Sequence, residues 1–259
     1  MKFLSGSLAF LFSIAFATPV FAQSPLRVAA AADLEPVLPP ILAQFQQATG
    51  IHAEATFQAS AMLTTQIQNG APFDLFLSAD VSYPKRLIDA GLADAAGTAD
   101  SSTPIVYARG TLVLWTRKDS HLTPSLALLS DPSLKRLAVA NPDRAPYGRA
   151  AVAALTSLTL YDTLKPKLVT AENISQAAQF ADTGNADAGL ISLTSALTPR
   201  LSGDGYYFVI PRDLYPPIEQ GAVIISKTTQ RAQAHKLLDY LLSAQIQAQL
   251  AKAGLTPVR

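Results

Sequence analysis

Short apolar runs rich in β-forming residues alternate with longer stretches of helical periodicity along most of this 259-residue chain. Alternation of this kind is typical of βαβ units, in which helices cover mainly parallel sheets. The fold class is therefore predicted to be α/β. Eight strands are predicted, at residues 26–31, 53–57, 74–78, 111–116, 137–140, 189–193, 206–210 and 222–226.

Two of the helical stretches have clear apolar faces. Between residues 34 and 45, large apolar side chains recur at spacings of three and four, although Pro39-Pro40 must kink or restart that helix. A second apolar face runs from Leu237 to Leu250, and Gly254 is a suitable stop.

Eight strands with their helices exceed one compact α/β unit of this length, so we predict two lobes. The stretch Ser101-Ser102-Thr103-Pro104 indicates a boundary, and Tyr215-Pro216-Pro217 indicates a return crossing. We assign residues 23–106 and 222–259 to lobe I and residues 107–221 to lobe II. The C-terminal helix is expected to pack back onto lobe I.

The first 22 residues have the pattern of a cleavable secretory signal. Lys2 precedes a mostly apolar run, and Val20-Phe21-Ala22 places small residues where a signal peptidase cuts, so cleavage is expected after Ala22. A transmembrane anchor is the alternative, but polar residues and a proline interrupt the run, which is shorter than the roughly 20 residues of a membrane span. We therefore expect export to the periplasm.

Composition excludes several classes of function. Cleavage would remove one lysine and no acid, which leaves 19 basic and 19 acidic residues and no net charge. A nucleic-acid partner would need a clustered basic stripe, so we expect none. The absence of cysteine excludes disulfides, thiol catalysis and thiolate metal sites.

Four segments place a polar or tight loop between a predicted strand and a following helix. In the first two, Asp33 and Ser60 are expected to cap their helices. In the fourth, Asn173 and Gln176 have the spacing of a capping box. The segments are residues 29–34, 58–61, 141–148 and 172–174.

Helix starts that converge at strand ends are suited to hold an anion. Their backbone N–H groups are unpaired and carry a partial positive charge, so no charged side chain is required. Open α/β sheets also bind ligands beyond the carboxyl ends of their strands. Every α/β protein needs helix caps, however, so ordinary capping is the alternative interpretation.

From Leu26 to about Pro257 the chain resembles periplasmic molybdate-binding proteins, the substrate-binding components of molybdate ABC importers. The most specific match is the run Gln66-Ile-Gln-Asn-Gly-Ala-Pro-Phe-Asp-Leu-Phe-Leu-Ser-Ala-Asp80. The other matches, in chain order, are Val28-Ala-Ala-Ala-Ala-Asp-Leu34, Phe57-Gln-Ala-Ser60, Asn141-Pro142 with Ala145-Pro-Tyr-Gly148, and Ala171-Glu-Asn-Ile174.

The resemblance implies a two-lobed type II periplasmic binding fold whose lobes close on molybdate or tungstate. The implied partner is the membrane permease of the importer; we expect a monomer without catalytic activity, resident cofactor or residues that ligate a metal cation directly. The implied oxyanion contacts are Ala32, Asp33, Ser60, Tyr147 and Ile174, mainly through backbone N–H groups, with the Ser60 hydroxyl as a further donor.

The chain departs from the family at two positions. Some members carry Ser or Thr-Asn where this chain has Ala32-Asp33, and some place a tyrosine donor where this chain has Ser192. Ser192 is therefore included as a candidate contact. A carboxylate facing a dianion would be repelled, so we expect the Asp33 side chain to turn away and cap its own helix. The alternative is that Asp33 accepts a hydrogen bond from a protonated oxyanion such as monohydrogen phosphate.

Three other functions are alternatives. A hydrolase would pair Ser60 or Ser192 with one of the three histidines, but no Gly-x-Ser-x-Gly motif surrounds either serine. A ferric-ion binder would use paired phenolates such as Tyr206-Tyr207, although these open an apolar strand and are expected to pack in the core. A sulfate or phosphate binder stays open, because a cage volume is not encoded in any single motif.

Overall fold

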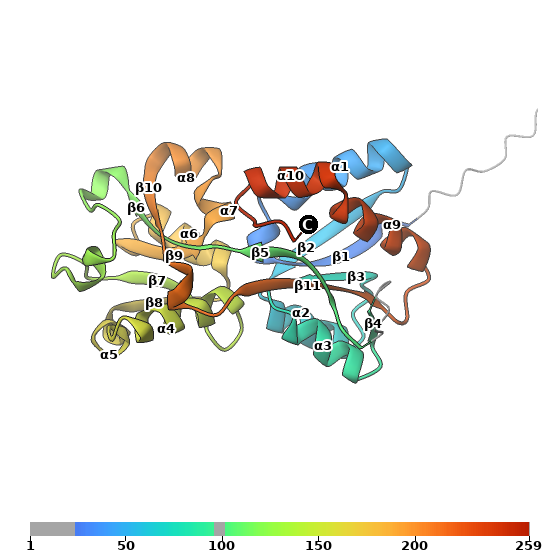
Figure 1. Ribbon diagram of the computed structural model, residues 1–259, viewed down its shortest axis with the longest axis horizontal. Coiled ribbons are helices and arrows are strands. Elements are labelled where there is room, and N and C mark those ends of the chain that lie inside the picture. The colour runs from blue at the N-terminus through green and yellow to red at the C-terminus, as the bar shows by residue number, and fades with distance from the viewer. Residues whose placement is uncertain (1–23, 96–101, 259) are drawn as a thin grey trace, which may run out of the picture.

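The computed structural model describes residues 24–95 and 102–258, which form two α/β lobes side by side (Figure 1). The two-lobed α/β fold is confirmed. The expected secretory signal lies outside the described residues. Within those residues, none of the helices is long and apolar enough to cross a membrane.

Lobe I is a sheet with the strand order β2-β1-β3-β11-β4, and β5 also pairs with β11. Its strands are β1 (Leu26–Ala31), β2 (Ala53–Gln58), β3 (Leu75–Ser78), β4 (Ala93–Asp94), β5 (Ile105–Gly110) and β11 (Ile218–Ile225). Helices cover both faces (Figure 1): α1 (Leu38–Thr49), α9 (Arg231–Leu242) and α10 (Ala244–Lys252) on one, and α2 (Ser60–Gln68) and α3 (Ser82–Asp89) on the other.

Lobe II is a second sheet with the strand order β10-β6-β9-β7-β8. Its strands are β6 (Leu112–Arg117), β7 (Leu137–Ala140), β8 (Leu168–Ala171), β9 (Ala188–Ser192) and β10 (Gly205–Val209). Its helices are α4 (Pro146–Ser157), α5 (Tyr161–Leu164), α6 (Ile174–Asp182), α7 (Leu193–Ala196) and α8 (Pro199–Asp204). Short 3-10 turns complete the chain at Ala32–Leu34 (η1), Lys118–Ser120 (η2), Ala127–Ser130 (η3), Lys165–Lys167 (η4) and Arg212–Leu214 (η5).

The chain passes between the sheets at Thr111 and again between β10 and β11. The expected lobe boundaries, after residue 106 and before residue 222, fall inside β5 and β11. Both sheets contain more antiparallel pairing than expected. The four strands that flank the crossings, β5, β6, β10 and β11, all pair antiparallel, while β2-β1-β3 and β8-β7-β9 are parallel.

All eight predicted strands are present, with ends that shift by up to four residues, and β1 and β7 have the predicted bounds. Strands β4, β5 and β8 were not predicted. Pro39-Pro40 acts as a restart: the 3-10 turn η1 ends at Leu34, and α1 then begins at Leu38 with both prolines in its first turn. The single C-terminal helix that was expected is two helices, which meet at Ser243.

The hydrophobic core is divided among the layers. One cluster lies between the lobe I sheet and α1, α9 and α10, so the C-terminal helices pack onto lobe I as expected. A smaller cluster lies beneath α2 and α3. The largest fills lobe II and also includes four alanines of lobe I, at positions 31, 32, 59 and 79. Small side chains thus allow the two lobes to approach closely.

Candidate ligand-binding site

The carboxyl ends of strands from both sheets face one small cavity between the lobes. The space accessible to the centre of a water-sized sphere is about 10 Å³, close to the minimum for one water molecule. Such a cavity suits a compact ligand of few atoms. Its lining residues are Ala31, Ala32, Asp33, Gln58, Ala59, Ser60 and Ala79 from lobe I, and Ala145, Pro146, Tyr147, Asn173 and Ile174 from lobe II.

Three α-helices of eight or more residues begin at this cavity: α2 from lobe I, and α4 and α6 from lobe II. The first backbone N–H groups of a helix have no partner within the helix and carry partial positive charge. Among the described residues, no lysine, arginine or histidine lines the cavity. The site therefore offers neutral hydrogen-bond donors rather than a cationic clamp.

Ser60 is the first residue of α2 and is fully buried. The expectation that its side chain caps the helix is wrong: Ala59 occupies the cap position, and no side-chain cap bond forms. The Ser60 hydroxyl oxygen instead accepts a hydrogen bond of 3.1 Å from the backbone N–H of Ala79. Because a hydroxyl also has one hydrogen to donate, Ser60 is polarised as a donor at the cavity.

Asp33 lies in the η1 turn that follows β1. Ala31 precedes the turn without a side-chain cap bond, so the expectation that Asp33 caps its own helix is also wrong. Its carboxylate does turn to other partners: Oδ2 accepts hydrogen bonds from the Tyr147 hydroxyl, at 3.1 Å, and from the Gln220 amide. Burial raises the pKa of Asp33 from 3.8 to about 6, and these two hydrogen bonds offset only part of that rise.

Tyr147 and Ile174 enter the cavity from lobe II at the starts of α4 and α6. Both are buried, so their side chains wall the cavity and their backbone N–H groups belong to the first helical turns. The capping interaction predicted at α6 is confirmed, since Asn173 Oδ1 accepts a 2.9 Å bond from the Gln176 N–H. The structure thus brings five candidates together: Ala32, Asp33, Ser60, Tyr147 and Ile174.

Ser192 is not among the residues that line this cavity. It ends β9 and caps α7, where its hydroxyl accepts a 3.2 Å bond from the Ser195 N–H. The hydroxyl also lies 2.9 Å from the hydroxyl oxygens of Thr194 and Ser195. These contacts satisfy Ser192 within lobe II, and the structure gives it no place beside the other five candidates.

Direct contacts hold the two lobes together around the cavity. The Ala61 N–H donates to the Arg144 carbonyl at 3.2 Å, and the Ser175 hydroxyl donates to the Ala32 carbonyl at 2.9 Å. The structure describes these lobes in a closed arrangement.

A larger set of contacts spans the lobes at the edge of the cavity. The Arg149 guanidinium of α4 bonds to the Asp80 carboxylate and, at 2.8 Å, to the Tyr83 hydroxyl. Sequence reasoning missed Arg149, Tyr83, Ala79 and Gln220 as contributors. Asp80 ends the long run that carried the family resemblance, which was the one available signal.

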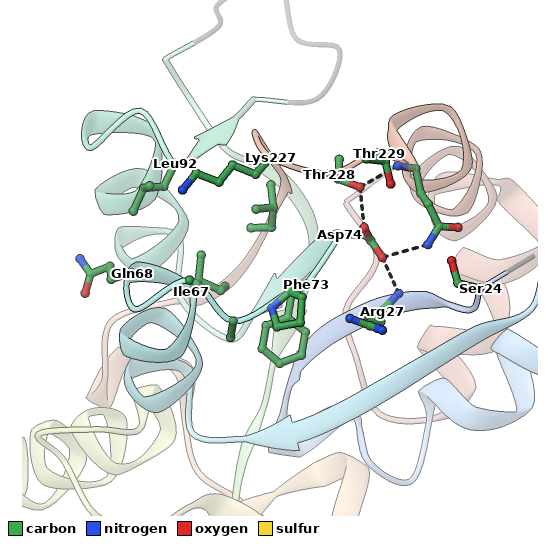
Figure 2. Close-up of a pocket in the computed structure, with 15 residues that line it drawn as sticks. Ser24, Arg27, Ile67, Gln68, Phe73, Asp74, Leu92, Lys227, Thr228 and Thr229 are labelled. Atoms are coloured by element: carbon green, nitrogen blue, oxygen red, sulfur yellow. Dashed lines mark hydrogen bonds between the residues drawn. The ribbon is translucent and has the colours of Figure 1, made fainter.

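A larger pocket, of about 320 Å³, lies near the amino ends of β1 and β3, away from the cavity between the lobes (Figure 2). Asp74 organises it by accepting bonds from the Arg27 N–H at 2.7 Å, the Thr228 hydroxyl at 2.5 Å and the Gln230 amide at 3.4 Å. These bonds join β1, β3 and the loop before α9. Asp74 therefore has a structural role, because its hydrogen bonds hold these three segments together.

The residues of the rival functions lie apart from the cavity. Tyr206 and Tyr207 are 56% and 42% exposed on the edge strand β10, so the expectation that they pack in the core is wrong. In the part of the chain that the structure describes, neither Ser60 nor Ser192 has a histidine hydrogen-bond partner.

Comparisons with known proteins agree with this architecture. The chain is 39% identical over 216 residues to the molybdate-binding protein ModA of Azotobacter vinelandii, which covers 83% of each chain. It is 36% identical to ModA of Rhodobacter capsulatus, over 96% of this chain and 95% of that protein. The solved structure of an Azotobacter vinelandii periplasmic molybdate-binding protein superposes with a TM-score of 0.83 at 30% identity, covering 90% of this chain and 100% of that one.

The model of the family described as bacterial extracellular solute-binding protein matches residues 26–256, nearly the whole of the described chain. This match, together with the ModA relatives, shows the family directly. The chain belongs to the bacterial extracellular solute-binding protein family.

Proposed function

We propose that this protein captures molybdate or tungstate between its two lobes in the periplasm and delivers the anion to the permease of an ABC importer. The observation that carries the proposal is the small cavity, free of cationic side chains, at which helices of both lobes begin. The identity to molybdate-binding relatives supports the choice of anion.

The chemistry of the cavity matches a fully deprotonated tetrahedral dianion, which has only acceptors. Ser60 would donate through its hydroxyl and backbone N–H groups, and Tyr147 and Ile174 through their backbone N–H groups at the helix starts. Ala32 and Asp33 would contribute backbone N–H groups from the η1 turn. Partial charges of helix termini stabilise an anion, and because the donors are neutral the anion can also be released.

Capture would proceed by closure of the lobes on the anion, since a ligand drives closure only through its greater affinity for the closed state. Helix starts from both lobes must meet around the anion, so the complete donor set exists only when the lobes are closed. The permease would recognise this closed form. The protein would act as a monomer, without a catalytic step or a resident cofactor.

Isothermal titration calorimetry of the purified protein with molybdate, tungstate, sulfate, phosphate and ferric ion tests the proposal. Calorimetry is preferable to tryptophan fluorescence, because Trp115 is fully buried in lobe II and bonds to the Leu201 carbonyl. We expect tight binding of molybdate and tungstate and much weaker binding of sulfate. Sulfate binding of equal strength would overturn the preference for molybdate, and binding of phosphate alone would overturn the ligand assignment.

A further inference from the structure

The Asp33 carboxyl is fully buried at the point where lobe I, lobe II and the crossing strands meet. Its Oδ2 atom accepts from Tyr147 of α4 and from Gln220 of β11. Its Oδ1 atom has no hydrogen-bond partner among the described residues. An ionised carboxylate at this position therefore leaves one buried oxygen without a hydrogen bond, which is costly for a charged group.

No cation compensates this carboxylate within the described residues. The titratable groups that face it are phenols: Tyr147 from α4, and Tyr107 from β5. Burial and the negative charge of Asp33 raise the pKa of both phenols, so they remain neutral. Tyr215 lies beside Tyr147, and its hydroxyl oxygen accepts a bond from the Leu112 N–H. Asp33 is the one group in this cluster that titrates near neutral pH, because burial raises its pKa to about 6.

Two further buried atoms beside Asp33 lack partners in the described structure, the Tyr107 hydroxyl and Gln220 Oε1. Both belong to the strands that connect the lobes, at an irregularity in their pairing. Ala108 pairs with Gln220 and Val106 pairs with Gly221, which leaves Tyr107 as the extra residue of a bulge. The cluster thus joins the crossing strands to the loop that lines the cavity, and it contains an acceptor that a protonated carboxyl can satisfy.

We propose that anion capture is coupled to the uptake of one proton at Asp33, so that the cavity takes a dianion together with a proton. The inference rests on the proposed function for the identity of the anion. Proton uptake also removes the electrostatic repulsion between a carboxylate and a dianion at one site. The carboxylate is neutralised as the anion enters, so the dianion lies beside an uncharged acid.

The sign of the coupling follows from electrostatics. A dianion beside Asp33 opposes its ionisation, so the pKa of Asp33 is higher in the complex than in the free protein. Between those two pKa values binding takes up a proton, and the dissociation constant rises by about tenfold for each unit of pH. In the closed, anion-free structure burial raises the pKa of Asp33 to about 6, so affinity falls as the pH rises above the pKa that Asp33 has before the anion binds.

Calorimetry with sodium molybdate at pH 7.5, in two non-phosphate buffers that differ in ionisation enthalpy, measures the protons taken up per anion. We expect close to one proton for the wild type and none for Asp33→Asn. The dissociation constant between pH 6.5 and 8.5 should rise for the wild type and stay flat for Asp33→Asn. Asp143→Asn is the matched control, because Asp143 is an exposed carboxylate on the loop that leads to α4, and it should retain full proton uptake.

Equal heats in the two buffers for the wild type, or equal proton uptake by Asp33→Asn, would overturn this inference while leaving the proposed function intact. Failure of the wild type to bind molybdate at all would overturn the proposed function. If Asp33→Asn does not fold, Tyr147→Phe replaces it. Removing that donor raises the pKa of Asp33, so the onset of the pH dependence should move to higher pH, and an unmoved onset would contradict the assignment to Asp33.

Discussion

Arg149 is expected to hold the lobes closed without touching the anion. Its guanidinium extends from α4 of lobe II to the Asp80 carboxylate and the Tyr83 hydroxyl of lobe I, and lies 5.3 Å from the centre of the Tyr83 ring. All three contacts cross between the lobes, so they exist only in the closed state. Arg149→Met removes them and retains most of the apolar stem.

The size of the effect follows from these contacts. With 40% of the Arg149 side chain and 28% of the Asp80 side chain exposed, the ion pair stabilises closure by at most about 1 kcal/mol. The charged hydrogen bond to Tyr83 contributes about 1 kcal/mol more, and the ring contact about 0.5 kcal/mol. Because one guanidinium makes all three contacts and they are not additive, we expect about 2 kcal/mol, or roughly thirtyfold in affinity.

Calorimetry and stopped-flow dissociation of molybdate measure this loss. We expect the dissociation constant of Arg149→Met to rise roughly thirtyfold, mainly through faster release. Arg144→Met is the control, because Arg144 pairs with Glu172 at 2.7 Å within lobe II and is similarly exposed. A change of less than threefold in Arg149→Met, or an equal loss in Arg144→Met, would refute the assignment of an interlobe contact that stabilises closure.

Three further outcomes are expected. Ser60→Ala should weaken molybdate binding by about 1.5–3 kcal/mol, since it removes a charge-assisted donor; a lower melting temperature with unchanged affinity would make Ser60 purely structural, through its bond to Ala79. Gly148→Ala should destabilise the protein by about 3 kcal/mol in chemical denaturation, because a Cβ atom would lie 2.2 Å from the Ala140 carbonyl oxygen; unchanged stability would contradict this packing. Asp33→Asn should stabilise the anion-free protein at pH 7.5 but not near pH 4. The free energy of unfolding of the wild type falls by up to about 3 kcal/mol as the pH rises from 3.8 to about 6, because Asp33 ionises more readily in the unfolded chain. Denaturation curves that differ by the same amount at both pH values would show that ionisation is not the cause.

The strands whose bounds were predicted correctly are apolar runs that begin and end sharply in the sequence. Residues 26–31 and 137–140 are bounded by polar or proline-containing segments, so their ends are visible in the sequence. Strands β4 and β8 have only two and four residues, too few for a periodic pattern. Strand β5 was missed for a different reason. It continues into β6 across Thr111 without a reversal of the chain, because the chain changes sheets there.

The location of the site could be predicted, but the roles of its side chains could not. Asp33 and Ser60 have the residue types and positions of helix caps, and local rules assign them that role. In the structure both side chains bond elsewhere: Asp33 to Gln220, 187 positions away, and Ser60 to Ala79, 19 positions away. Tertiary contacts of this kind leave no local signal, which is why both capping assignments failed while the capping of α6 by Asn173 was correct.

The composition of the cavity explains why the ligand preference is harder to predict than the site. Five alanines and the backbone of three helix starts form most of its wall, and these groups recognise negative charge through geometry rather than through a distinctive side chain. Tetrahedral dianions share their charge and acceptor pattern, so the distance between the lobes must discriminate among them. That distance depends on the contacts between the lobes, above all those of Arg149 and of the buried cluster around Asp33. Selectivity among oxyanions should therefore respond to changes at the lobe interface as strongly as to changes at the residues that touch the anion.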